Sequence, residues 1–446
     1  MNIRTNAAVS AIFSIFYSAS IYAVDYEYSI DTSASTSNNI SQLVDGAEGN
    51  LYQATLLFNI ENQDYRDFTF EFNSEIARLD YTTTNLRSEN QYNLNLFTEY
   101  APSASNFSII ALGDVTQVPA NRFQIQEANN LREGQTYALL PQYFLKFTDT
   151  LQVNFNYQHA LYEVQSDANT NTLQDSSRDE QQGTFSLINQ INPTNSLQLV
   201  YQKKDTDFKD DSNPLNADFE QYDVLARWVN TGRTNSLNLE LGQSRIKDIF
   251  GRNSTDDNGR LSFTRNINDR QSMSVQLNKG VASLFSINQA TGRIVINQQN
   301  DSIALAQISK GGGAQYNYSD DIFTMNLSYF ENKLTGVFEE REELRRNRSL
   351  FVSYNLSNLF QSDAENTLSI FSSISENDFD INITNVTQNL VRQTVYTYSY
   401  RASRNFRFYL SFTDRRAQQD FSDISPILIT SESLSLGFIY QENGRF

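Results

Sequence analysis

Cysteine is absent from this chain of 446 residues, and only one histidine and one tryptophan occur in it. Without cysteine there are no disulfides, no thiolate metal ligands and no thiol nucleophiles. Because His159 is the single imidazole, any mechanism that needs a histidine base must use that residue. The sequence therefore lacks most of the common routes to enzymatic chemistry.

Basic residues are also scarce, since 34 Lys and Arg stand against 52 Asp and Glu and give a formal charge of -18. Nucleic-acid binding needs a basic surface, so nucleic acid is not expected as a partner. Hydrophobic residues make up only 39% of the chain, yet it holds 24 Tyr and 31 Phe. A membrane β-barrel needs little buried core but many aromatic residues at the two interfaces, so this composition favours one.

No apolar run reaches the ~20 residues that a helix needs to cross a bilayer. The nearest is Ala7 to Tyr17, which follows Arg4 and precedes Ile21 to Ala23. A positive start, a short apolar stretch and a small-residue cleavage site predict a secretory signal peptide over residues 1–23, with an uncleaved anchor as the alternative. Residues 24–446 are then expected to form one domain.

A strict alternation of apolar and polar residues dominates the chain from residue 24 onward. In Leu151 to Gln158, for example, Leu, Val, Phe and Tyr alternate with Gln and Asn. A period of two puts the apolar set on one face of a strand and the polar set on the other. The same alternation recurs in Phe68 to Phe72, Tyr92 to Leu96, Leu197 to Tyr201, Leu237 to Leu241, Met273 to Leu277, Phe323 to Tyr329, Leu350 to Tyr354, Phe406 to Phe412 and Leu434 to Tyr440.

The connections between these runs are alternately short and long. Asn192 to Asn195 and Ser319 to Asp321 are short polar breaks, whereas Asp248 to Asn258 and Ser283 to Asp301 are longer polar segments. Bacterial barrels have short periplasmic turns and long extracellular loops. The sequence thus predicts an all-β fold, a transmembrane antiparallel up-and-down β-barrel of about 20 strands, within a range of roughly 16 to 20.

A soluble propeller or β-solenoid is the main alternative fold. Such proteins repeat a motif at each turn, often with glycine. Only 17 glycines occur here and no repeated motif is visible, which favours the membrane barrel.

The polar phase of the alternation indicates what a lumen would contain. It holds many Asn, Gln, Ser and Thr residues with scattered charges of both signs. Such a lining suits hydrated, sugar-like or mixed small solutes better than a strongly ion-selective pore, although the charges could instead pair and stiffen the wall. The charged lumen-lining candidates are Asp67, Glu71, Glu75, Asp223, Arg227, Glu240, Arg260 and Arg407.

His159 falls in the lipid-facing phase with Phe155 and Tyr157. An outer-membrane hydrolase would need its imidazole beside inward or rim partners, so a catalytic His159 is disfavoured and no enzyme activity is expected.

Two charged segments have simple interpretations. Asp205, Asp207, Asp210 and Asp211 predict a solvated acidic loop, with binding of divalent ions that bridge lipopolysaccharide as the alternative. Glu339 to Arg348 predicts the edge of a long loop, or a short helix with its acids first and bases last. No metal site and no cofactor is predicted.

The chain ends at Phe446, in the same even-numbered phase as Phe438 and Tyr440, with Glu442 and Gly444 interrupting the apolar pattern. A terminal strand of alternating apolar residues ending in Phe resembles the C-terminal signal by which the assembly machinery recognises Gram-negative outer-membrane proteins. The resemblance implies an outer-membrane location and an assembly signal formed by Phe438, Tyr440 and Phe446.

The chain from residue 24 also resembles, loosely, the β-barrel porins encoded near exopolysaccharide and exosortase systems. The likeness lies in an opening strand Tyr26 to Thr36 that runs into Ser37 to Ser41, in barrel length, and in hairpins such as Ser403 to Phe406. It implies transport or assembly of surface glycan.

The leading functional expectation is a porin-like outer-membrane channel for polar solutes, with oligosaccharide or exported polysaccharide as candidate cargo. The alternative is a non-conducting barrel that serves a surface-polysaccharide export or assembly system as scaffold or binding partner. The expected partners are outer-membrane lipid and lipopolysaccharide, the barrel-assembly machinery, and a polysaccharide or small polar solute.

Overall fold

The computed structural model describes residues 24–39, 46, 48–62, 67–82, 88–103, 105–119, 131–164, 177–209, 218–281, 285–288, 293–296, 307–338, 342–357, 365–379, 386–422 and 425–445. The predicted signal peptide, residues 1–23, and Phe446 of the predicted assembly signal lie outside the described residues.

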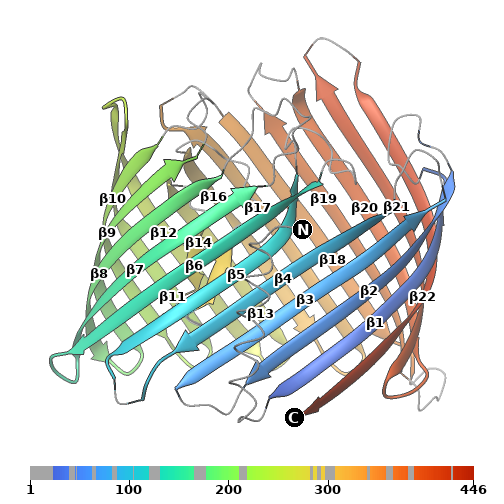
Figure 1. Cartoon of the computed structure of the whole chain (residues 1–446), viewed down its shortest axis with the longest axis horizontal. Coiled ribbons are helices and arrows are strands. Elements are labelled where there is room, and N and C mark those ends of the chain that lie inside the picture. Colours follow the sequence, from blue (N-terminus) through green and yellow to red (C-terminus); the bar gives the residue numbers. More distant parts are fainter. Residues whose placement is uncertain are drawn as a thin grey trace, which may run out of the picture.

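A single antiparallel sheet of 20 strands forms the wall of the molecule (Figure 1), which confirms the predicted fold class and strand number. Each strand pairs with the next one along the chain, and β13 pairs directly with β16. The strands are β1 (Asp25–Ser37), β2 (Gly49–Asn62), β3 (Phe68–Tyr81), β4 (Glu89–Tyr100), β5 (Phe107–Pro119), β6 (Leu131–Lys146), β7 (Leu151–Val164), β8 (Arg178–Asn192), β9 (Asn195–Phe208), β10 (Phe219–Thr231), β11 (Asn235–Asp248), β12 (Asn253–Asn268), β13 (Gln271–Val281), β16 (Gln307–Ser319), β17 (Phe323–Gly336), β18 (Glu342–Asn355), β19 (Asn366–Phe379), β20 (Val386–Arg401), β21 (Phe406–Phe421) and β22 (Ile427–Arg445).

The first and last strands close the barrel. β1 pairs with β22 along its whole length, from Asp25 opposite Arg445 to Ser37 opposite Ser433. Because the hydrocarbon core of a membrane offers no hydrogen-bond partners, a sheet can span it only when no strand edge is left open. Among the described residues, no helix has the length and apolar character needed to cross a membrane.

The outer face is apolar and exposed. Ile30, Leu56, Ile76 and Tyr92 lie in one row across β1 to β4, with exposed fractions of 38% to 46%. On β21 the outward residues from Phe406 to Phe412 are all apolar, which at ~3.3 Å per residue and a tilt of about 40° covers about 15 Å of height. An exposed apolar belt of this kind is typical of a membrane-spanning barrel.

Most connections alternate in length as the sequence predicts. β8 and β9 are joined by residues 193–194, and β16 and β17 by residues 320–322, whereas most connections at the opposite end are longer. Two connections differ from the prediction, because residues 249–252 form a short connection at the loop end and residues 356–365 form a long one at the short-turn end. Residues 25 and 445 lie at the short-turn end, which is the periplasmic end of a bacterial barrel.

Several strands extend into segments that the sequence predicts as loops. β11 and β12 occupy most of Asp248 to Asn258, and β18 includes Glu342 to Arg348, which is therefore neither loop edge nor helix. The reason is that the hydrogen-bonded ladder continues beyond the lipid-facing band. The outward residues there are mostly polar, with Leu344 as an exception, so the apolar signal ends before the strand does.

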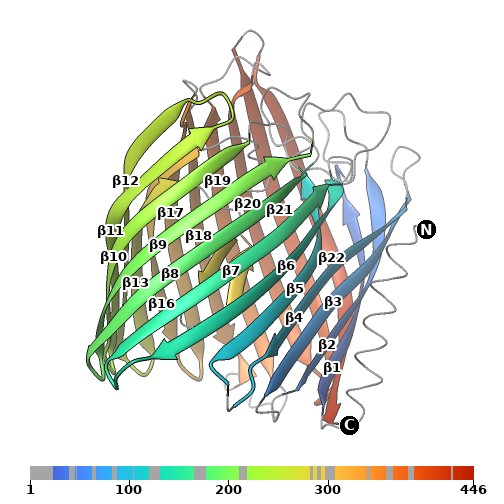
Figure 2. The same cartoon turned by 60° about the vertical axis from the view of Figure 1, so that its left-hand side comes forward.

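A small hairpin interrupts the long connection between β13 and β16. It consists of β14 (Phe285–Asn288) and β15 (Arg293–Ile296), within a segment predicted as a loop. In both views the hairpin lies within the outline of the barrel (Figures 1 and 2).

Asp320 organises the short turn between β16 and β17. Its carboxylate accepts hydrogen bonds from the Tyr318 hydroxyl (2.6 Å) and from the backbone N–H groups of Ile322 (2.9 Å) and Phe323 (2.7 Å). These hydrogen bonds favour the ionised form and hold the pKa of Asp320 below its usual value.

The alternation of the two faces can be tested with single cysteines, because the chain has none of its own. Leu410→Cys places a label on the outer face and Ser411→Cys places one on the inner face, one residue away. We expect a fluorophore at residue 410 to be quenched by a lipid-soluble quencher and one at residue 411 by a water-soluble quencher. Equal access of both labels to the aqueous quencher would contradict the membrane assignment.

Asp320→Ala should lower the unfolding temperature by about a few degrees at neutral pH, because it removes the acceptor of three hydrogen bonds. Since the folded-state pKa is lowered, the stabilisation is present above the usual carboxyl pKa and is lost as the pH falls through the folded-state value. Thermal unfolding followed by circular dichroism should show the two proteins converging in strong acid. A difference that persists there would assign the effect to packing.

Candidate functional site

The inner face of the β17–β22 side is lined by hydroxyl groups. Ser328 and Ser349 are joined by a hydrogen bond of 2.6 Å, and so are Thr367 and Ser399. The inner-face side chains of Ser353, near the short-turn end of β18, and Ser373, in the middle of β19, are only partly buried. This part of the wall therefore presents neutral hydrogen-bonding groups to the interior.

Amide groups continue this lining over β13, β16 and β17. Asn317 accepts a hydrogen bond from Gln315 (3.2 Å) and donates one to Ser272 (3.3 Å), and Asn326 donates to Asn317. A second chain joins Asn278, Ser309 and Asn332 at 3.1 Å and 2.7 Å. The amides are thus held in place by neighbours on the same face.

Seven of the charged residues proposed for the lumen lie on the inner face of a strand: Glu71, Glu75, Asp223, Arg227, Glu240, Arg260 and Arg407. Asp67 does not. It lies in the bend before β3, where its carboxylate accepts the backbone N–H of Ser103 at 2.7 Å. Asp67 is therefore a turn residue, because the strand ladder starts only at Phe68.

Three of these residues meet on β10, β11 and β12. Glu240 is the cross-strand neighbour of both Arg227 and Arg260. Arg227 Nε donates to Glu240 Oε2 at 2.7 Å, and its Nη1 donates to Gln198 at 3.3 Å. The Arg227 and Glu240 side chains are only 11% and 12% exposed, so this pair stiffens the wall and leaves Arg260 as the exposed charge.

A buried charged triad on β8 and β9 was not predicted. Glu180 Oε1 lies 2.8 Å from Arg178 Nε and Glu180 Oε2 lies 2.7 Å from Lys204 Nζ, with all three side chains 4% to 5% exposed. The Arg178 guanidinium also lies over the rings of Tyr162 and Phe208, at 5.1 and 5.7 Å. The alternation marks these residues as inward, but no sequence signal shows which inward residues become covered.

Part of the inner face of β4 to β7 is apolar and covered, which differs from the lumen dominated by neutral hydrogen-bonding groups that the sequence predicts. Leu140 and Ala160 are 1% exposed and Ile110 is 2% exposed. They belong to an inner cluster of Phe97, Ile110, Ala138, Leu140, Ala160 and Tyr162. The interior is therefore covered around the apolar cluster of β4 to β7 and the triad of β8 and β9. Over β17 to β22 the hydroxyl-lined wall is only partly buried toward the short-turn end, whereas its loop end is covered around Leu334, Ala417 and Ile429.

A basic recess lies on the inner face near the short-turn end. Arg401, Arg404 and Arg407 line it together with Asp31 and Gln441. Arg401 pairs with Glu365 at 3.1 Å, while Asp31 accepts a hydrogen bond from Tyr409 at 2.9 Å. The recess is a place where an acidic group on a solute could be held.

The residues considered for other chemistry lie elsewhere. His159 is on the outer face, opposite Leu139, with Nε2 2.8 Å from Asp179 Oδ1. Asp205 and Asp207 are part of β9, and Asp205 accepts a hydrogen bond from Lys203 at 3.0 Å. Asp210 and Asp211 are outside the described residues, and within the described part of the chain no group of three or more His, Asp or Glu residues could hold a metal ion.

The interruptions in the terminal strand have a local explanation. Glu442, on the outer face of β22, accepts hydrogen bonds from Tyr28 (2.7 Å) and Tyr440 (2.6 Å). A Cβ atom at Gly444 would meet the Tyr26 ring at 2.5 to 2.7 Å. Tyrosines at the membrane interface thus surround the positions where the apolar alternation stops.

The closed ladder, the exposed apolar band and the short turns at the end where Asp25 pairs with Arg445 define a β-barrel of the bacterial outer membrane. No protein-family model matches the chain, and no curated protein matches it.

Several solved structures of outer-membrane proteins are similar in backbone. The FrpB iron transporter from Neisseria meningitidis is 10% identical, with 94% of this chain and 81% of that chain covered and a TM-score of 0.43. The siderophore receptor PirA from Pseudomonas aeruginosa is 11% identical, with 94% and 80% covered and a TM-score of 0.43. The copper transporter OprC is 10% identical, with 93% and 80% covered and a TM-score of 0.43.

Glu180→Ala should reduce the free energy of unfolding by about 3 to 5 kcal/mol, because it leaves two buried cations without their shared carboxylate. Urea unfolding of the barrel in lipid vesicles measures the change. Glu75→Ala is the matched control, since Glu75 is an exposed inner-face carboxylate and its loss should change little. Equal effects of the two substitutions would show that the buried triad does not contribute to the free energy of unfolding.

Proposed function

We propose that this barrel is a channel that lets polar, sugar-like solutes cross the outer membrane. The observation that carries the proposal is the partly exposed inner wall of β17 to β22, which is lined by serine and threonine hydroxyls. Neutral donors and acceptors replace part of the hydration of a polyhydroxylated solute without selecting strongly for ionic charge.

Two aromatic residues on the same inner wall support a glycan as the solute. Phe351 on β18 and Phe371 on β19 are cross-strand partners, and Phe371 is 38% exposed. Ser349, Ser353 and Ser373 surround them on the inner face. A sugar ring has hydroxyl edges and apolar C–H faces, so a surface that alternates hydroxyl groups with aromatic rings fits an oligosaccharide or an exported polysaccharide.

A non-conducting scaffold for a surface-polysaccharide system is the second candidate. The observation that favours it is the covered inner wall over β4 to β9, formed by the buried apolar cluster and the Arg178–Glu180–Lys204 triad. In that case the glycan would be recognised outside the lumen. For neither candidate do we propose catalysis.

Single-channel recording of the purified chain in planar bilayers tests the channel. We expect a steady open level that a soluble neutral oligosaccharide blocks transiently. Phe351→Ala with Phe371→Ala should shorten each blocking event by about fivefold, since about 1 kcal/mol of aromatic contact is lost. Phe408→Ala, which removes an outer-face ring, is the control and should leave the events unchanged.

Absence of any open level under conditions where the barrel is folded would overturn the channel and support the scaffold. Open levels that oligosaccharide never interrupts would retain a channel but remove the glycan as its solute.

A further inference from the structure

The outer face of the barrel carries two rows of cations near the loop end. Arg348 and Arg392 both pair in register with Ile374, and Arg392 pairs with Arg416, which sets the arginine row across β18 to β21. The lysine row crosses β13, β16 and β17, where Lys310 is the cross-strand partner of both Lys279 and Lys333. All of these positions share the phase of the exposed apolar residues and therefore point away from the lumen.

The arginine row lies just above the apolar band. On β18 the next outward residues toward the short-turn end are Leu350 and Val352. On β20, Tyr396 is the second outward residue from Arg392 toward the short-turn end. On β21, Phe412 is the second outward residue from Arg416 in the same direction. At the loop end of an outer-membrane barrel, this height is where the acyl chains of the outer leaflet meet their headgroups.

These cations are only partly neutralised within the chain. Arg348, Arg392 and Arg416 are all exposed, and among the described residues Arg392 has no ion-pair partner. The Arg348 guanidinium lies 5.8 Å from the centre of the Tyr329 ring, and Arg416 lies 3.4 Å from the Asp414 carboxylate. In the lysine row, Lys279 and Lys333 each have a carboxylate at 2.6 Å, whereas Lys310 has none within the described part of the chain.

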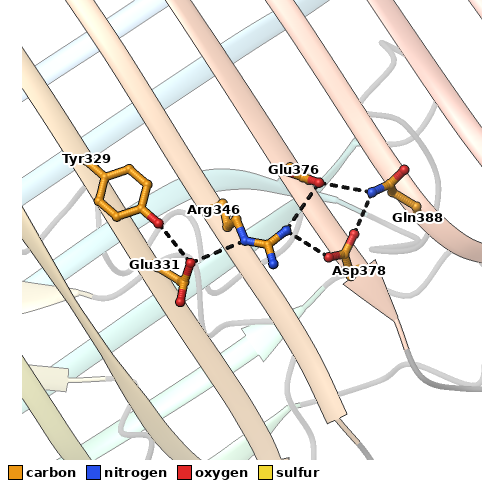
Figure 3. A network of polar contacts seen from close by, with 6 residues as sticks. All are labelled: Tyr329, Glu331, Arg346, Glu376, Asp378 and Gln388. Carbon is orange, nitrogen blue, oxygen red and sulfur yellow. Dashed lines mark hydrogen bonds and ion pairs between the residues drawn. The ribbon is translucent and has the colours of Figure 1, made fainter.

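Arg346, which neighbours the arginine row, is neutralised by carboxylates of the chain itself. Arg346, one outward position above Arg348, lies within 3.3 Å of Glu331, 3.2 Å of Glu376 and 3.0 Å of Asp378 (Figure 3). Like charges that face each other across a strand pair are destabilising. An external anion would therefore be favourable beside Arg392, which faces Arg416, and beside Lys310, which lies between Lys279 and Lys333.

We propose that the arginine row and the lysine row bind the phosphate groups of lipopolysaccharide in the outer leaflet. Guanidinium groups bind phosphate oxygens through paired, charge-assisted hydrogen bonds. The acyl chains of the same molecule then lie along the apolar band below the row, so one ligand satisfies both surfaces. Clustered cations beside a membrane-spanning segment are typical of binding to anionic headgroups.

The distribution of outward cations supports this choice of ligand. Within the described strands, Arg265 on β12 is the one outward-facing cation in the short-turn half. The outer face at that end instead carries residues such as Tyr28 and Tyr440. The basic rows thus lie on the leaflet that contains the phosphorylated glycolipid, on a chain whose net charge is -18.

The test compares lipopolysaccharide bound to full-length protein purified from outer membranes in mild detergent, counted by native mass spectrometry. The variant Arg348→Gln, Arg392→Gln, Arg416→Gln should retain about tenfold less lipid. The control Arg265→Gln with Arg233→Gln removes arginines at the opposite end and should retain the same amount as the unaltered chain. The conductance of the triple variant should be unchanged, which separates this inference from the proposed channel.

A second arm keeps the proposal testable if the triple variant does not assemble. For the unaltered barrel, intact lipopolysaccharide should raise the unfolding temperature, whereas enzymatically dephosphorylated lipopolysaccharide and inorganic phosphate should not. Replacement of the three arginines by lysine should preserve most of the effect. Equal stabilisation by intact and dephosphorylated lipid, or full retention of lipid by the triple Gln variant, would overturn the proposal.

Discussion

The hydrogen-bonding requirement of a backbone placed in hydrocarbon governs this structure. Each strand must find partners on both sides, and the pairing of β1 with β22 removes the last open edge. The same closed ladder explains how a chain without cysteine can hold a single architecture, because every neighbour is fixed by its register. Once the ladder is closed, each residue of a strand faces either the outside or the interior, and all other features follow from that division.

The outer face has a vertical order that reflects its surroundings. Tyrosines and Glu442 lie near the short-turn end, an apolar band follows, and a charged collar begins where Asp414 succeeds Phe412 on β21. The collar contains both acidic and basic residues, but Arg392 and Lys310 lie beside other cations. The collar is therefore the part of the outer surface where an anionic headgroup of the outer leaflet would neutralise cations.

The interior is not symmetric, and this asymmetry decides how the functional candidates are weighed. A hydroxyl-lined wall with Phe351 and Phe371 faces the more open side, whereas the apolar cluster around Leu140 and the Glu180 triad are covered. A solute passage would follow the open side. The covered side gives the barrel an internal packed region, which a simple polar pore would not need.

The sequence by itself determined the antiparallel barrel class, a strand number of about 20 within a range of 16 to 20, and the inward phase of Glu71, Arg227 and Arg407, because a period of two is a local property of a strand. It could not show that Asp67 belongs to a turn, that Glu342 to Arg348 continues a strand above the membrane, or that Leu140 is covered from inside. It also could not align Arg348, Arg392 and Arg416, which are distant in the chain. Those outcomes depend on cross-strand register and on which segments fold against the inner wall, and only the tertiary structure decides both.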